Sequence, residues 1–207
     1  MNYSALNKVR VSTGNLADYI ENVSALLRRS RVKGLAEVAF YHSLTDPQEL
    51  YVLTLWFGEN ELEETFRQLA AGHFPLLTKN ITALSFATFR LIWEQRSLSY
   101  PVVGSTLHLL RWPPGQEKHD RFVNYMREMR WKLEGVVGGW VGSPTQDRTR
   151  ILIRTDWGSV EAMQAYYYSP YYREEREFYR SRSVSVEQGS THLHSLVYPA
   201  RSDEADD

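Results

Sequence analysis

The chain contains YVLTLW at residues 51–56 and LIRTDW at residues 152–157. Each stretch is typical of a short β-strand that ends in tryptophan, and each is followed at once by a run with helical periodicity. Trp56 and Trp157 are 101 residues apart, and Gly34 and Gly135 are separated by the same 101 residues. Landmarks that share one offset indicate an internal duplication. We therefore expect two similar units in one polypeptide.

The length and composition are those of an ordinary globular protein. A chain of 207 residues allows one large domain or two small ones, and the repeat favours two. A net charge of −1 provides no basic face, so we expect no nucleic-acid partner. The absence of cysteine excludes disulfides, thiolate metal sites and cysteine nucleophiles. No signal-peptide segment or membrane span is apparent, so we expect a cytoplasmic protein without membrane contact.

Residues 1–94 are predicted to form a β-α-β-β-α-β unit. Alternation predicts a first strand over residues 7–12, in which Asn7 shares a face with Val9. An apolar stripe then predicts a helix over residues 16–27. The other predicted elements are strands over residues 36–43, 49–57 and 83–93 and a helix over residues 60–70.

Residues 95–103 contain a proline and several polar residues and are predicted to be a linker. Residues 104–199 repeat the element order of the first unit. Residues 200–207 form an acidic tail that we expect to be disordered. The predicted elements of the second unit are strands over residues 106–112, 136–142, 149–157 and 191–198 and helices over residues 122–129 and 159–179.

Two split β-α-β units of this kind predict an α+β fold made of two tandem ferredoxin-like units. Each unit would have an antiparallel sheet with helices on one face, which leaves the other face apolar and open. Two such sheets can cover each other, so we predict that the halves pack as a pseudo-dimer within one chain. Both a monomer and a homodimer of pseudo-dimers remain open.

The second half contains TDWGSVEA at residues 155–162 and SPYY at residues 169–172, and the first half matches through LTLW at residues 53–56. In this pattern a strand ending in tryptophan is followed by a helix with an acidic first turn. With it, the chain resembles the antibiotic biosynthesis monooxygenase family over nearly its whole length. The resemblance implies a dimeric α+β barrel, here formed by a single chain. This fold hosts oxygenases, haem-degrading enzymes and isomerases, so the reaction must be argued from the site.

The first half also resembles the haem-degrading branch of this fold. The resemblance implies an asparagine on the first strand, a tryptophan in the second helix and a histidine further along. Asn7 matches the asparagine and His73 lies near the expected histidine, but the place of the tryptophan falls near Thr65 or Phe66. Haem would therefore bind only in the first half, through His73. The alternative role of His73 is to cap a helix end.

Asn7 and His108 occupy matching positions on the first strands of the two units. A buried amide or imidazole needs hydrogen-bond partners, so both could be satisfied polar groups of the core. In the catalytic alternative, His108 would deprotonate a phenol or hydroquinone, and Asn7 would be a dipolar donor in the other half. We therefore predict a monooxygenase-like enzyme that oxidises a planar aromatic small molecule without metal or flavin. Haem binding or degradation and a non-catalytic binding or interaction protein are the alternatives.

Candidate substrate-binding residues are Trp56, Trp157, Arg154, Asp156, Phe66 and Tyr171. Trp56 and Trp157 end equivalent strands, where an aromatic ring commonly packs under the next helix instead. Arg154 and Asp156 replace two leucines of the first unit. They would either form an ion pair on a solvated face or line a pocket in the second unit.

The tyrosine-rich run over residues 166–172 is the other aromatic feature of the second unit. These rings would either wall a cavity or fill the seam between the halves, and we favour the seam. His192 and His194 are two residues apart, so their side chains would share one face of a strand. A third ligand is not evident nearby, so we expect a solvated strand face there and no metal site.

Overall fold

The computed structural model describes residues 3–11, 16–30, 32–70, 81–96, 101–114, 122, 124–125, 128, 132–145, 147, 149–191 and 195–197. The first half comprises β1 (Tyr3–Val11), α1 (Leu16–Ser30), β2 (Leu35–Ser43), β3 (Glu49–Trp56), α2 (Glu59–Ala70) and β4 (Ile81–Arg96). The second half comprises β5 (Gly104–Arg111), β6 (Val136–Pro144), β7 (Arg150–Trp157), α5 (Val160–Tyr168), α6 (Pro170–Ser181), β8 (Ser185–Thr191) and β9 (Ser195–Val197).

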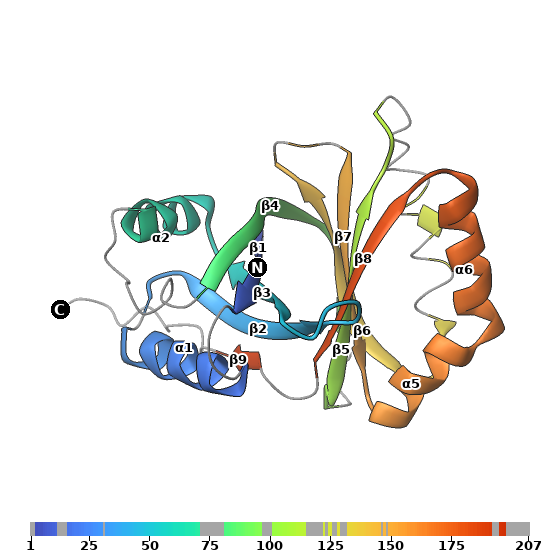
Figure 1. The fold of residues 1–207 in the computed structure, drawn as a ribbon, viewed down its shortest axis with the longest axis horizontal. Helices are drawn as coiled ribbons and strands as arrows, with labels where there is room; N and C mark the ends of the chain where they lie inside the picture. Colours follow the sequence, from blue (N-terminus) through green and yellow to red (C-terminus); the bar gives the residue numbers. More distant parts are fainter. Residues whose placement is uncertain are drawn as a thin grey trace.

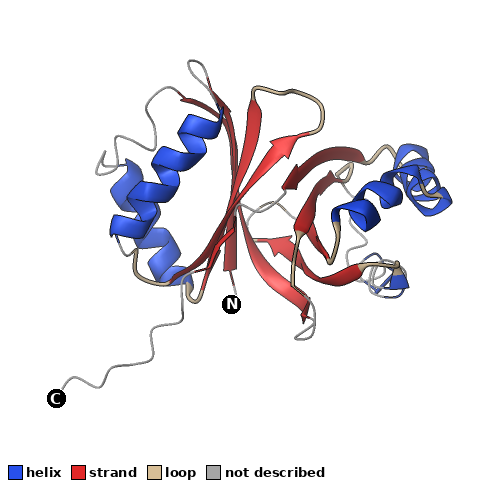
Figure 2. Cartoon of the chain, turned by 90° about the horizontal axis from the view of Figure 1, so that it is seen from below, coloured by secondary structure: helices blue, strands red, loops and turns tan. Residues whose placement is uncertain are grey.

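Strands β1 to β8 close into an antiparallel barrel (Figure 1). The pairing order is β4-β1-β3-β2 in the first half and β8-β5-β7-β6 in the second. Pairing of β4 with β6 and of β8 with β2 joins the halves at two places, and β9 continues along β2 beyond β8. Helices α1 and α2 lie on one side of the strands, and α5 and α6 lie on the opposite side (Figure 2). The predicted α+β class is confirmed.

Among the described residues, β1 to β3 and α2 of the first half correspond to β5 to β7 and α5 of the second at the predicted offset of 101 residues. Strands β2 and β6 both follow a glycine with positive φ, 76° at Gly34 and 81° at Gly135. The carbonyl oxygen of Gly34 accepts from the amide of Phe57 at 3.0 Å, and that of Gly135 accepts from the amide of Gly158 at 2.9 Å. The halves therefore share one architecture. A duplication as its origin stays a prediction.

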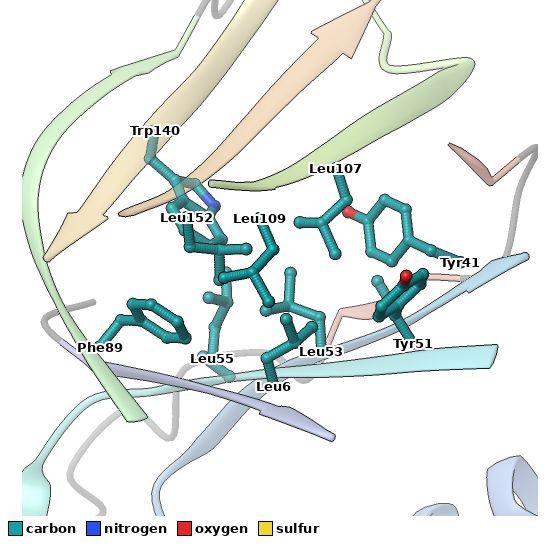
Figure 3. Packing of buried hydrophobic residues seen from close by; sticks show 12 residues of the cluster. Leu6, Tyr41, Tyr51, Leu53, Leu55, Phe89, Leu107, Leu109, Trp140 and Leu152 are labelled. Atoms are coloured by element: carbon teal, nitrogen blue, oxygen red, sulfur yellow. The ribbon is translucent and has the colours of Figure 1, made fainter. Parts of the chain in front are cut away.

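The barrel interior is filled by apolar side chains from both halves. Strand alternation directs one set of side chains inward and the other set toward the helices. The inward residues point at one another across the barrel (Figure 3). This confirms that the two sheets cover each other's apolar faces. The interior cluster consists of Leu6, Ala36, Ala39, Tyr41, Tyr51, Leu53, Leu55, Phe89, Leu107, Leu109, Trp140 and Leu152.

The last strand of each half departs from the prediction. Strand β4 continues to Arg96, into the predicted linker, and residues 97–100 lie outside the described part of the chain. The predicted last strand over residues 191–198 contains β9, but β8 begins at Ser185 and was not predicted, because the polar sequence SVEQGST has weak strand propensity. Pairing with β5 and β2 overrides that propensity. Gly189 suits this path, since a Cβ there would lie 2.9 Å from the side chains of Tyr41 and Tyr51. The acidic tail lies outside the described residues.

Candidate functional site

A groove of about 550 Å³ lies where α2, β4 and the turn between β6 and β7 meet. We call it the α2–β4 groove. The residues from α2 are spaced i, i+3, i+4 and i+7, so they form one face of the helix. Both halves contribute, because β4 pairs with β6 across their junction. The lining residues are Glu59, Leu62, Glu63, Phe66, Phe86, Ala87, Thr88, Pro144, Thr145, Asp147 and Arg150.

Two phenylalanine rings form the apolar wall of this groove. The ring centroids of Phe66 and Phe86 are 4.5 Å apart, with an angle of 54° between the ring planes. Phe66 packs against the apolar cluster beneath α1 and α2, whereas the Phe86 side chain is 47% exposed. Aromatic walls with accessible surface are typical of sites that bind flat apolar ligands. Of the predicted binding residues, Phe66 is the one that lines the groove.

Asn7 lies beside the groove on the helix-facing side of β1. Its cross-strand partners are Val52 on β3 and Phe86 on β4. Directly opposed residues in an antiparallel pair point to the same face, so Asn7 and Phe86 share the outer surface of the sheet. Val9 packs in the outer cluster on this face, as the alternation predicted. Asn7 is half-buried, one strand away from the aromatic wall.

Carboxylates predominate among the charged residues of the groove. Glu59 accepts a hydrogen bond from the Tyr3 hydroxyl, and this bond is the largest of the effects that raise the pKa of Tyr3. Hydrogen bonding from the Thr149 hydroxyl is the largest of the effects that lower the pKa of Asp147. Arg150 Nε lies 2.9 Å from Asp147 Oδ2. Asp147 is therefore ionised at neutral pH and paired with Arg150.

The turn between β6 and β7 is attached directly to β4. The amide of Thr145 donates to the carbonyl oxygen of Thr88 at 3.0 Å, and the two hydroxyl groups are hydrogen-bonded to each other. These bonds fix the second-half wall of the groove against the first half. Sequence reasoning missed Phe86, Asp147 and Arg150, because the groove depends on the register between β4 and β6, which leaves no local signal in the sequence.

His108 lies on the opposite side of the barrel from the groove. It is 1% exposed on the helix-facing side of β5, and its ring centroid is 6.2 Å from that of Tyr166. Asn7 and His108 thus occupy matching places in the two halves, each facing its own helices. The structure does not bring them together at one site.

The tyrosine-rich run, apart from the exposed Tyr168, fills the space between α5, α6 and the sheet of the second half. Tyr166 is buried beside Trp157, and Tyr167, Tyr171 and Tyr172 pack around them. The prediction that this run fills the seam between the halves is wrong. The halves meet through paired strands and the barrel interior, so the outer helices do not face that seam. Tyr171, a predicted binding residue, belongs to this packed cluster.

Arg154 and Asp156 lie inside the barrel, because they alternate on β7 with outward-facing residues. They are 6% and 8% exposed, so the predicted solvated face is wrong although the ion pair exists. Arg154 Nη1 is 2.5 Å from Glu37 Oε1, and its Nε is 2.6 Å from Asp156 Oδ1. The Ser105 hydroxyl donates to Asp156 Oδ1 at 2.6 Å. The pair therefore belongs to a buried network that joins β2 to β7, and neither residue lines the α2–β4 groove.

Burial disfavours the charged form of Arg154, but the interactions of the guanidinium with its neighbours favour that form more strongly. Desolvation lowers the pKa of the guanidinium, whereas Asp156, Tyr41 and Glu37 raise it, and the net pKa is well above the usual value. The arginine therefore remains a cation inside the barrel. Sequence reasoning missed Glu37, although a single carboxylate in the otherwise apolar run of β2 was a usable signal.

Trp56 and Trp157 are packed in the core of their own halves. They are 2% and 1% exposed, and neither belongs to the lining of the groove. Trp56 Nε1 donates to Thr54 Oγ1 at 2.8 Å, and Trp157 Nε1 donates to Thr106 Oγ1 at 3.2 Å. The remaining candidates, His73, His192 and His194, lie outside the described residues. In the part of the chain that is described, no helix has the length and apolarity to cross a bilayer.

No protein-family model matches the sequence, and no curated protein matches it. Among solved structures, a candidate monooxygenase from Fusobacterium nucleatum is 8% identical, with a TM-score of 0.68 and coverage of 96% of this chain and 98% of that one. An anthrone oxidase-like protein is 12% identical, with a TM-score of 0.68 and coverage of 96% and 94%. A haem-binding protein from Thermus thermophilus is 13% identical, with a TM-score of 0.56 and coverage of 93% and 91%. At these identities the likeness establishes the fold alone, and this chain shares the α+β barrel fold of these proteins.

Proposed function

We propose that the protein is a monooxygenase-like enzyme that binds a planar aromatic small molecule in the α2–β4 groove. The observation that carries this proposal is the Phe66–Phe86 wall in a groove of about 550 Å³, a volume within the range of small-molecule sites. The fold supports it, since similar structures include a candidate monooxygenase and an anthrone oxidase-like protein. The fold does not fix the substrate, so the site residues must define it.

The proposed reaction uses dioxygen and an electron-rich phenol, without metal or flavin. One oxygen atom enters the ring to give a quinone, and the other leaves as water together with the two displaced hydrogens. Ionised Asp147 would accept a hydrogen bond from the substrate hydroxyl and orient it. When the phenol proton passes to Asp147, Asn7, which shares its face with Phe86, would donate to the oxyanion left on the substrate. His108 takes no part in this reaction, because it lies on the opposite side of the barrel from the groove, beside Tyr166.

Oxygen uptake with phenols and hydroquinones tests the proposal, with the Phe86→Ala variant beside the wild type. Loss of an aromatic contact of about 0.5–1.5 kcal/mol should weaken substrate binding roughly two- to tenfold. Phe57→Ala is the matched control, because Phe57 is 44% exposed and does not line the groove. The proposal fails if no such compound binds, or if Phe86→Ala binds it as the wild type does. Binding without turnover would instead indicate a non-catalytic binding protein.

Haem is the second candidate ligand, supported by the fold shared with a haem-binding protein from Thermus thermophilus. The described lining of the groove does not fit haem. It contains no histidine and has three carboxylates, which would repel the two propionates of the ligand. A haemin titration followed by absorbance, with His73→Ala beside the wild type, decides the matter. A saturating Soret shift that His73→Ala removes would establish haem binding.

A further inference from the structure

We propose that the aromatic ligand of the α2–β4 groove carries a positive charge, so that its class is an aromatic ammonium compound. This inference rests on the proposed function and names its substrate class. The lining contains a single guanidinium, that of Arg150, and three carboxylates, those of Glu59, Glu63 and Asp147. Because Arg150 pairs with Asp147 at 2.9 Å, Glu59 and Glu63 remain uncompensated within the lining.

The two glutamates and the aromatic wall share one face of α2. Glu59 and Glu63 are one helical turn apart, and Glu63 and Phe66 are separated by three residues, so their side chains are neighbours. A ring lying on Phe66 and Phe86 would therefore place a short ammonium substituent beside both carboxylates. The faces of the two phenylalanine rings also attract a cation.

The helix dipole accounts for only part of this acidic face. Carboxylates in the first turn of a helix are stabilised by its positive end, and Glu59 and Glu61 lie in that turn. Glu63 lies beyond the first turn and still lines the groove. The Tyr3 hydroxyl that bonds to Glu59 is neutral, so it does not cancel the charge. Arg90 pairs across from Tyr3 and is exposed, outside the groove lining.

Binding of three ligands with one ring system and different charges tests this inference. The probes are naphthylmethylammonium, naphthylmethanol and naphthoate, each titrated by calorimetry at low and high salt. Two exposed ion pairs should favour the cation over the neutral probe roughly three- to tenfold, with naphthoate weakest. The preference should shrink as salt rises, because exposed charges are screened. Glu59→Gln combined with Glu63→Gln should abolish it.

Glu64→Gln is the matched control, because Glu64 is on α2, bonds to Arg67 and Gln68, and does not line the groove. It should keep the preference for the cation. Equal binding of the three probes, each weakened by Phe86→Ala, would overturn the charge inference and leave the groove as the site. An equal effect of Glu64→Gln and Glu63→Gln would overturn it as well. If none of the probes binds, or if Phe86→Ala changes nothing, the proposed function itself fails.

Discussion

Gly34 and Gly135 have the same backbone conformation at equivalent places, with φ of 76° and 81°. A side chain at this φ is strained, since Cβ approaches the following carbonyl oxygen. Space is also lacking, because a Cβ on Gly34 would meet Glu61 and one on Gly135 would meet Ala162. Each glycine thus lets the start of a strand pass close beneath the helix that follows the next strand.

Gly34→Ala and Gly135→Ala should each lower the free energy of unfolding by about 2 kcal/mol or more, through strain and steric overlap. Urea denaturation followed by tryptophan fluorescence would measure the loss. Gly58→Ala is the control, since its new Cβ would meet mainly the flexible end of the Glu61 side chain. We expect this control to cost less than about 1 kcal/mol. Equal losses in all three variants would contradict the argument.

At the scale of elements, local patterns predicted most strands and helices, but they did not predict which elements each one packs against or pairs with. The strands ending at Trp56 and Trp157 have strong propensity and clear ends, so both were found. Strand β8 was not, because its stability comes from its neighbours β5 and β2. Alternation placed Arg154 and Asp156 on one face but could not say that this face is the barrel interior. Phe66, a predicted binding residue, lies in the groove lining, whereas its ring partner Phe86 depends on long-range pairing.

A buried carboxylate joins the two helices of the second half, α5 and α6. Glu175 on α6 is 2% exposed, and it accepts from the Tyr166 hydroxyl at 2.5 Å and from the Tyr179 hydroxyl at 2.6 Å. Hydrogen bonds to charged groups are stronger than those between neutral groups. This pair of helices therefore has a structural role, in contrast with α2 of the first half, which forms a wall of the groove.

Tyr179→Phe should lower the free energy of unfolding by about 1.5–3 kcal/mol, because it removes one donor from a buried carboxylate. Ligand binding in the α2–β4 groove should not change, since α6 does not line it. Tyr168→Phe is the control, because Tyr168 is 86% exposed, and we expect it to change stability by less than about 0.5 kcal/mol. Thermal and urea unfolding, with the groove probes titrated in parallel, would check both statements. Weaker ligand binding in the groove, with an unchanged free energy of unfolding, would contradict both statements.

At the scale of the whole molecule, charged residues join the two halves at two places. Lys8 on β1 lies 2.9 Å from Glu187 on β8, and Arg154 on β7 is bonded to Glu37 on β2. The equivalents of Arg154 and Asp156 in the first half are leucines, so the network has no counterpart there. Two copies of the first half would thus offer Glu37 no matching cation. The charges favour pairing of unlike halves, and that pairing also builds the groove, whose walls come from both.

Arg154→Met should lower the free energy of unfolding by about 3–5 kcal/mol, because it leaves Glu37 and Asp156 buried without their cation. Replacing the whole network, with Glu37→Leu and Asp156→Leu added, should restore most of that loss, since an apolar cluster needs no compensating charge. Urea unfolding followed by fluorescence and circular dichroism would measure both variants, and light scattering would report their oligomeric state. If the triple variant is as unstable as Arg154→Met, the loss arises from packing and not from uncompensated charge. If it is stable but associates with other copies, the charges are what confine pairing to the two halves of one chain.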